Sequence, residues 1–206
     1  MTRRVILLHG LWMNGLTMQW LAARLKAAGF VPETFGYHSI VGGPDDAVSR
    51  LATLLRDGGP AHVVAHSLGG LIALEALAAD PELPVERVVC LGVPLCGSGA
   101  AAGLTRWPLV SLWLGRSAGL LQRGCALWPS RVQVGMVAGS LPRGLGALFA
   151  HFEQAHDGTV SVDETRSPAL ADHVVVASSH SGLLFSAQAA RYAIAFLRRG
   201  RFEPVD

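Results

Sequence analysis

The chain of 206 residues has the length of one sizeable domain, since domains usually hold about 100 to 200 residues. Half of its residues are hydrophobic and 16% are charged, which excludes intrinsic disorder and indicates a compact, largely buried fold. The 17 basic and 15 acidic residues are scattered along the sequence, unlike the clustered charge of a nucleic-acid-binding protein. We therefore expect a single domain over residues 1–206 that has no nucleic-acid partner.

The N-terminal segment MTRRVILLHG has the charges that begin a signal peptide, but its apolar run is too short for the hydrophobic region of one. We read it as the start of the mature fold. A membrane span needs about 18 uncharged apolar residues, and arginines interrupt the most apolar stretch, Leu104 to Leu127. The three cysteines, Cys90, Cys96 and Cys125, match no zinc or redox spacing. We expect a soluble, cytoplasmic protein with reduced thiols and with neither a cofactor nor a metal.

Short apolar runs alternate along the chain with longer segments of helical period, which is the pattern of βα units wound into a parallel sheet. This pattern predicts strands over residues 4–8, 30–35, 62–65, 87–91, 132–138 and 173–177. It predicts longer helices over residues 17–28, 45–56, 68–79 and 185–199. The runs VVCLG and VVVAS are apolar throughout, as expected of strands covered on both faces. The expected fold class is α/β, with a mostly parallel central sheet of about six strands flanked by helices.

The expected helix ends carry recognisable signals. Gly29 follows the first helix as a left-handed cap, Asp45 after Pro44 can cap the second, and Asp80 before a proline stops the third. The densest basic cluster, Arg198, Arg199 and Arg201, closes the last helix. Cations are favoured there by the helix dipole, so we interpret the cluster as structural rather than as a binding site.

Residues 97–130 do not fit the alternation of strands and helices. This stretch holds three of the five tryptophans and many leucines between two strands that one short helix would normally join. We expect an insertion of one or two short helices at the rim of the sheet. Its apolar side chains can form a small cap over a ligand pocket or a patch that meets lipid transiently. Burial in the core is the alternative for each of them.

Residues able to perform chemistry follow four of the expected strands, as the sequences HGLW, HSLG, HDG and SSHSG. Reactive groups gather at the carboxyl ends of the strands in open α/β sheets, so these loops are expected to meet. Ser67 ends an apolar strand and has small residues, Ala65 and Gly69, at both second neighbours. Such spacing is typical of a nucleophile elbow, where bulkier residues would collide as the helix leaves the strand. A plain turn serine is the alternative, because the motif is AxSxG rather than GxSxG.

A serine hydroxyl needs a general base within reach and a carboxylate that orients the base. His180 follows the last expected strand, and Asp157 follows the one before it, so we predict His180 as the base and Asp157 as the acid. Glu153 and Asp163 are rival acids, and Asp157 can also be a simple turn aspartate.

An acyl-transfer site also needs N–H donors for the developing oxyanion. We predict the backbone amides of Leu11 and Leu68 in this role, the second at a helix N-terminus. We expect His9 to hydrogen-bond to loop backbone near the site and His66 to turn its side chain away from the base. The histidines show no zinc-binding spacing.

The segments VILLHGLW, HVVAHSLGG, HDGTV and SSHSGLL resemble the α/β-hydrolase superfamily, and within it the small lidless bacterial lipases and esterases. The resemblance covers the chain except for residues 97–130 and implies Ser67 as nucleophile, Asp157 as acid and His180 as base. It also implies oxyanion amides at Leu11 and Leu68. We therefore expect a serine hydrolase that cleaves carboxylic esters through an acyl-enzyme.

The substrate is expected to be a small-molecule ester with an apolar acyl group, and candidates for its binding site are Trp12, Leu95, Trp107 and Trp113. If residues 97–130 border the acyl site, their deletion should alter the preference for acyl-chain length. The same triad can also serve an acyltransferase or a perhydrolase, and a non-catalytic scaffold with this fold is a third reading. The oligomeric state is left open by the sequence.

Overall fold

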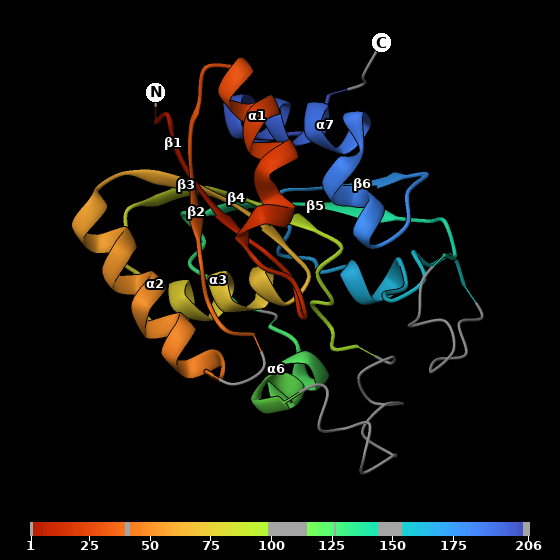
Figure 1. The fold of residues 1–206 in the computed structure, drawn as a ribbon, viewed down its shortest axis with the longest axis horizontal. Coiled ribbons are helices and arrows are strands. Elements are labelled where there is room, and N and C mark those ends of the chain that lie inside the picture. The colour runs from red at the N-terminus through yellow and green to blue at the C-terminus, as the bar shows by residue number, and fades with distance from the viewer. Residues whose placement is uncertain (1, 40–41, 99–114, 126, 144–153, 204–206) are drawn as a thin grey trace.

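The computed structural model describes residues 2–39, 42–98, 115–125, 127–143 and 154–203. Its centre is a sheet with strand order β2-β1-β3-β4-β5-β6, in which all neighbouring strands are parallel (Figure 1). The strands are β1 Arg4–Leu8, β2 Val31–Phe35, β3 Ala61–His66, β4 Val85–Leu91, β5 Gln133–Gly139 and β6 Asp172–Val176. Each expected strand is present within two residues of its predicted bounds, and the expected α/β class with a parallel sheet is confirmed.

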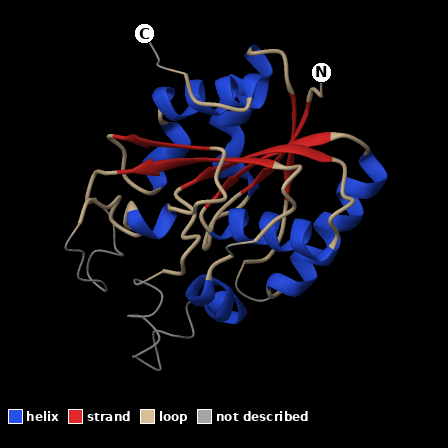
Figure 2. Cartoon of the chain, turned by 180° about the vertical axis from the view of Figure 1, so that it is seen from behind, coloured by secondary structure: helices blue, strands red, loops and turns tan. Residues whose placement is uncertain are grey.

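Helices cover both faces of this sheet (Figure 2). The longer helices are α1 Gln19–Ala27, α2 Pro44–Gly58, α3 Leu68–Ala79 and α7 Ala187–Arg199, and a shorter one is α6 Ala118–Arg123. Short 3-10 helices are η1 Gly15–Met18, η2 Gly115–Ser117, η4 Asp163–Thr165 and η5 Ser181–Phe185.

Two hydrophobic clusters correspond to the two faces. Residues of α2, α3 and α6 pack with one set of strand side chains, and residues of α1 and α7 pack with the alternate set. Along β3, for example, Val63 lies in the first cluster and Val64 in the second, because successive side chains of a strand point to opposite faces. The inner strands β1, β3, β4 and β5 are therefore largely buried on both sides, as the run VVCLG predicted. The same expectation for VVVAS is wrong, because β6 is an edge strand and its Val175 is 40% exposed. The other edge strand, β2, is also mostly not buried.

The helix ends agree with the sequence signals except at α2. Gly29 follows α1 with a φ of 92°, and Asp80 ends α3, as predicted. The expectation that Asp45 caps α2 is wrong: Gly43 occupies the cap and Pro44 begins the helix. A proline at the first helical position lacks an N–H that would go unpaired there, so the helix starts one residue earlier. Asp45 instead lies in the first turn, where the helix dipole favours a carboxylate.

Within the insertion, the described residues form η2 and α6, so the expected short helix is present. Leu120 and Leu121 are buried in the cluster around α3, and Arg123 of α6 pairs with Glu75 of α3. Trp128 is partly buried against the same cluster. Of the described helices, none is both long and apolar enough to cross a membrane.

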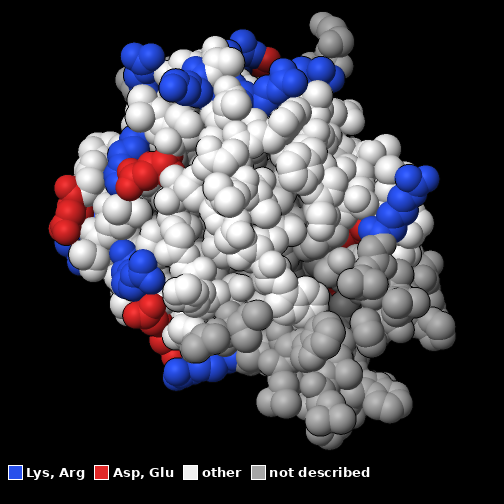
Figure 3. Space-filling view, viewed as in Figure 1, with Lys and Arg blue, Asp and Glu red and all other residues white. Residues whose placement is uncertain are grey.

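The basic cluster at the end of α7 is tied to the protein itself. Arg199 and Arg201 both pair with Glu203, and Arg198 donates to the carbonyl of Ala28 at 2.7 Å. In Figure 3, basic side chains gather near this end of the molecule with acidic ones among them, and the centre of that face is uncharged. These contacts support the structural interpretation of the cluster.

Candidate active site

Ser67 stands at a sharp corner between β3 and α3. Its φ is 52° and its ψ is −124°, and α3 begins at the next residue. A Cβ placed on Gly69 would lie 2.5 Å from the carbonyl oxygen of His9 and 2.8 Å from the Cβ of Leu8. A larger residue at position 69 would therefore collide with β1, which is the steric demand expected of a nucleophile elbow.

Strained backbone is concentrated at this corner and at the loop after β1. Among the described residues, Ser67 and Trp12 are the two non-glycine residues with positive φ, at 52° and 60°. Such a conformation costs of order 1–3 kcal/mol and persists only where the surrounding structure enforces it. Both residues belong to the set that the sequence singled out, and this strain marks the site independently of any motif.

Asp157 and His180 are brought together in the loops that follow β5 and β6. Nδ1 of His180 lies 2.7 Å from Oδ2 of Asp157, and both side chains are buried. The other carboxylate oxygen accepts the N–H groups of Thr159 at 2.9 Å and Val160 at 2.8 Å. The N–H of His180 donates to the Asp157 carbonyl at 2.9 Å. The carboxylate thus contacts Nδ1 of the imidazole, and Nε2 has no hydrogen-bond partner among the described residues.

The rival acids do not share this geometry. Asp163 is exposed at the start of η4 and lies 3.5 Å from the guanidinium of Arg166. Glu153 lies outside the described residues. The carboxylate that contacts the histidine is therefore that of Asp157.

The Ser67 hydroxyl and His180 form no hydrogen bond within the described residues, and such contacts often tighten only when substrate binds. Gly92 lies close to both His180 and Asp157. Gly92 follows β4 with a φ of 58°, and a Cβ there would lie 3.1 Å from Nδ1 of His180 and 3.2 Å from Oδ2 of Asp157. The end of β4 is thus packed against the histidine–carboxylate pair.

The loop after β1 lies against Ser67. The N–H of Met13 donates to the Gly10 carbonyl at 3.4 Å, which closes a turn with Leu11 and Trp12 at its corners. A Cβ on Gly10 would lie 3.2 Å from the Cβ of Ser67. Leu68 is the first residue of α3, where N–H groups have no partner within the helix. The turn and the helix start are therefore adjacent to Ser67, and their role as oxyanion donors stays a prediction.

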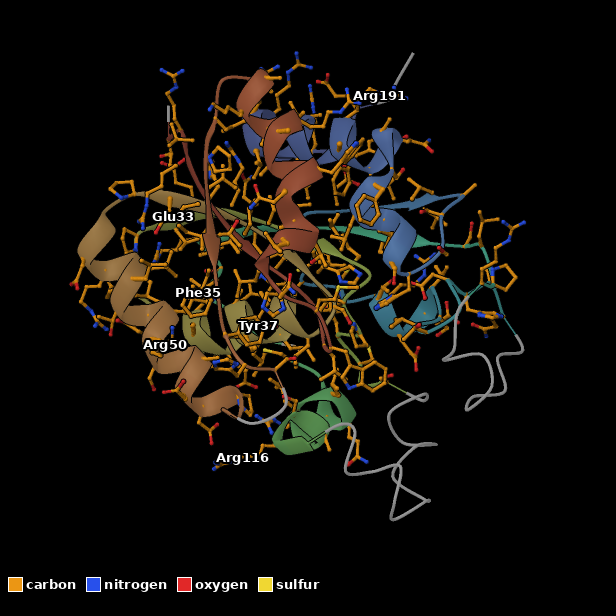
Figure 4. All side chains as sticks on the ribbon, in the orientation of Figure 1. Glu33, Phe35, Tyr37, Arg50, Arg116 and Arg191 are labelled. Carbon is orange, nitrogen blue, oxygen red and sulfur yellow. The ribbon has the colours of Figure 1, made fainter. Side chains whose placement is uncertain are left out.

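Tyr37 supports the loop after β1 through contacts with His9, a role that the sequence analysis missed. Its hydroxyl donates to the His9 carbonyl at 2.6 Å, and its ring stacks on that of His9 at 4.3 Å. The stack continues outward through Phe35 to Arg50 (Figure 4). The sequence signal was an aromatic residue just beyond the second strand. As expected, His9 itself hydrogen-bonds to loop backbone, the carbonyl of Gly10 at 2.9 Å.

Two buried serines hold the other side of the loop. The N–H of Trp12 donates to Oγ of Ser39 at 3.2 Å, and the hydroxyl of Ser117 donates to the carbonyl of Ser39 at 2.7 Å. Ser117 precedes α6, so the described part of the insertion is linked to the loop through Ser39.

The expectation that His66 turns its side chain away from His180 is wrong, because the two rings lie close together. Its ring centroid lies 4.6 Å from that of His180, and its Nε2 lies 3.0 Å from the His180 carbonyl oxygen. The reason is the alternation along β3, which places His66 on the same face as Val64. That face is the one covered by α7 and by η5, which His180 precedes.

The candidate substrate residues differ in their placement. Trp12 is 49% exposed, whereas Leu95 is buried in the core and its carbonyl accepts the N–H of Cys125 at 3.1 Å. Trp107 and Trp113 lie outside the described residues. A pocket of about 180 Å³, lined by residues from Arg166 to His173, lies at the start of β6 and contains none of the predicted site residues. Within the described ranges, no group of three or more His, Cys, Asp or Glu side chains could hold a metal ion.

Known structures share this fold. The chain is similar to the mature lipase BlEst2 of Bacillus licheniformis, with a TM-score of 0.76 and 20% identity over 97% of this chain and 92% of that one. It is similar to phospholipase PlaB of Legionella pneumophila, with a TM-score of 0.67 and 18% identity over 97% and 57% of the two chains. For the metagenomic carboxyl esterase MGS0156 the TM-score is 0.64, with 19% identity over 86% and 64%. At these identities the likeness concerns the fold.

Comparison of the sequence with protein families identifies the family of the chain. No curated protein sequence matches the chain, but the model of the alpha/beta hydrolase family matches residues 5–201. This match spans both the elbow and the loops that hold Asp157 and His180. The protein therefore belongs to the alpha/beta hydrolase family.

Proposed function

We propose that this protein is a serine hydrolase that cleaves carboxylic esters through an acyl-enzyme on Ser67. The observation that carries the proposal is the buried contact of 2.7 Å between His180 and Asp157, beside a serine at a strained strand-to-helix corner. A serine hydroxyl becomes a nucleophile when an imidazole, oriented by a carboxylate at Nδ1, can accept its proton at Nε2. The membership in the alpha/beta hydrolase family supports the same class of chemistry.

In the proposed reaction, Nε2 of His180 takes the hydroxyl proton as Oγ of Ser67 attacks the ester carbonyl. Asp157 keeps the imidazole oriented and stabilises its charged form. The backbone amides of Leu11 and Leu68 stabilise the oxyanion, and each such donor is worth about 3 to 4 kcal/mol. The imidazolium then protonates the leaving alcohol. Water attacks the acyl group with His180 as base, which releases the acid and restores the hydroxyl of Ser67.

We further propose a small ester with an apolar acyl group as the substrate and the cytoplasm as the location. Support for the substrate comes from the similar solved structures, which are described as a lipase, a phospholipase and a carboxyl esterase. Support for the location comes from the cysteines, since Cys90, Cys96 and Cys125 are all free. Unpaired thiols are typical of proteins in a reducing compartment.

The deciding experiment is covalent labelling of the purified protein with a fluorophosphonate, which reacts with activated serines. We expect one label per chain, located on Ser67 by peptide mass mapping, and no label in Ser67→Ala. Ser49→Ala is the matched control, because Ser49 is exposed on α2 and its hydroxyl donates to the helix carbonyl of Asp45. A folded protein that takes no label would overturn the proposal and favour a non-catalytic scaffold.

A further inference from the structure

Among the described residues, three hydrogen-bond contacts hold His180, and Asp157 supplies two of them. Asp157 accepts from the ring Nδ1 at 2.7 Å and from the backbone N–H at 2.9 Å. The third contact is at the backbone carbonyl of His180, which lies 3.0 Å from Nε2 of His66. His66 is the residue directly before the proposed nucleophile, so one short segment of β3 contacts the base and presents the serine.

The burial and the position of the His66 ring suit this contact with His180. His66 is fully buried, and its ring lies against the His180 ring with centroids 4.6 Å apart and planes inclined by 49°. A carbonyl oxygen can only accept, so Nε2 of His66 must carry the proton and donate it. The side chain therefore fixes both the backbone and the ring position of the base.

The surroundings of Nδ1, the other ring nitrogen of His66, also favour a proton on Nε2. Nδ1 of His66 is buried and has no hydrogen-bond partner within the described residues. It faces the loop after β1, where a Cβ on Gly10 would lie only 2.7 Å away. A proton on Nδ1 would place an unpaired donor in the interior, which is costly. The geometry thus favours the neutral imidazole with its proton on Nε2.

We propose that His66 is a positioning residue, which acts as a neutral Nε2–H imidazole that holds His180 in place against Ser67. This inference rests on the proposed function for its effect on turnover, while the contact itself stands on the geometry. Burial, then the nearby charge of His180, lowers the pKa of His66 well below 6.5, and the charge of His9 acts in the same direction. A neutral neighbour does not oppose the imidazolium that His180 becomes during the reaction.

The test compares three substitutions. In His66→Gln, the amide nitrogen stands as many bonds from the backbone as Nε2 and keeps the donor. His66→Leu removes the donor at similar volume. His62→Leu is the matched control, because His62 is also fully buried on β3 and its ring nitrogens have no hydrogen-bond partner within the described residues.

Ester hydrolysis and thermal stability are measured for each variant. We expect His66→Leu to lower kcat about 100-fold with KM changed less than about threefold, since a misplacement of about 1 Å costs that much. His66→Gln should keep kcat within about fivefold of the parent protein, and His62→Leu should leave kcat unchanged. A kcat for His66→Leu within about twofold of the parent, or an equal fall in all three variants, would overturn the proposal.

Nitrogen-15 NMR of the histidine rings supplies a readout that does not depend on turnover. We expect His66 to show the neutral Nε2–H form at every pH at which the protein stays folded, and the Nδ1 proton of His180 to shift in His66→Leu but not in His66→Gln. A neutral Nδ1–H form of His66 would refute the inference even in an active enzyme. If the parent protein takes no fluorophosphonate label, the proposed function fails, and the NMR result alone decides the role of His66.

Discussion

Replacing Asp157 with Asn should nearly abolish ester hydrolysis, for a reason that the hydrogen bonds around the carboxylate make specific. Oδ1 accepts two backbone N–H groups, of Thr159 and Val160, and Oδ2 faces Nδ1 of His180. An asparagine will keep its oxygen on the two N–H donors. Its NH₂ group then faces His180 and forces the imidazole proton onto Nε2, where the ring can no longer accept the proton of Ser67.

The size of the effect follows from the cost of turning the amide over. The flipped amide would leave two N–H groups without an acceptor, the buried one of Val160 and the partly buried one of Thr159, at about 1–3 kcal/mol each. The smaller sum, about 2 kcal/mol, already limits the flipped form to about 3% of molecules. The wrong tautomer alone therefore lowers kcat at least about 30-fold. Loss of the negative charge beside the imidazolium adds to this, and the equivalent change in serine proteases costs about 10⁴.

The assay is the steady-state hydrolysis of a chromogenic short-chain ester, with circular dichroism to show that each variant is folded. Asp163→Asn is the matched control, because Asp163 is one of the two rival acids and lies exposed beside Arg166. We expect Asp157→Asn to lose 30-fold to about 10⁴-fold in kcat and Asp163→Asn to keep it. A folded Asp157→Asn protein with more than a tenth of the parental kcat would refute the reasoning.

Two further predictions concern packing and pH. Gly92→Ala should lower kcat about 10- to 100-fold, because its Cβ would press on Nδ1 of His180 at 3.1 Å, whereas Gly59→Ala has the same kind of positive φ with nothing within 4 Å and should lower only the melting temperature. Equal kcat in the two variants would count against a contact with the base. Burial lowers the pKa of His9, His62, His66 and His173 below 6.5, so the unfolded chain binds more protons and the free energy of unfolding should fall as pH drops below about 6.5. His62→Leu should reduce that slope by at most about 1.4 kcal/mol per pH unit in urea titrations, and an unchanged slope would contradict the assignment.

The centre of the sheet could be predicted from the sequence because its inner strands are largely buried on both faces and therefore read as apolar runs. The loops that meet at the site followed from the parallel arrangement, since the carboxyl ends of such strands share one edge. The ends of the helices could be predicted less closely, because local backbone geometry decides where each helix begins. The predicted first helix, for example, begins with η1, a 3-10 turn whose N-cap is Asn14. A sequence pattern does not distinguish these two helical forms at a terminus.

The contacts that brace the site could not be predicted in the same way, because they depend on which face each side chain takes at the end of a strand. The roles of His66 and Tyr37 are of this kind. Each comes at or just beyond the end of a strand, and neither belongs to a spacing pattern that indicates a partner. His66 contacts a residue 114 positions away along the chain, and only the folded sheet brings the two together.

The link between the insertion and the loop after β1 changes how the insertion should be tested. Deleting residues 97–130 would remove Ser117, whose hydroxyl holds the carbonyl of Ser39, and Ser39 in turn accepts the N–H of Trp12. Trp12 has a φ of 60° and needs such support to stay strained. A deletion would therefore disturb the turn that contains Leu11 and lower kcat for short and long esters alike. Ser117→Ala measures that common loss, and only a change in chain-length preference beyond it can be assigned to contact between the insertion and the acyl group.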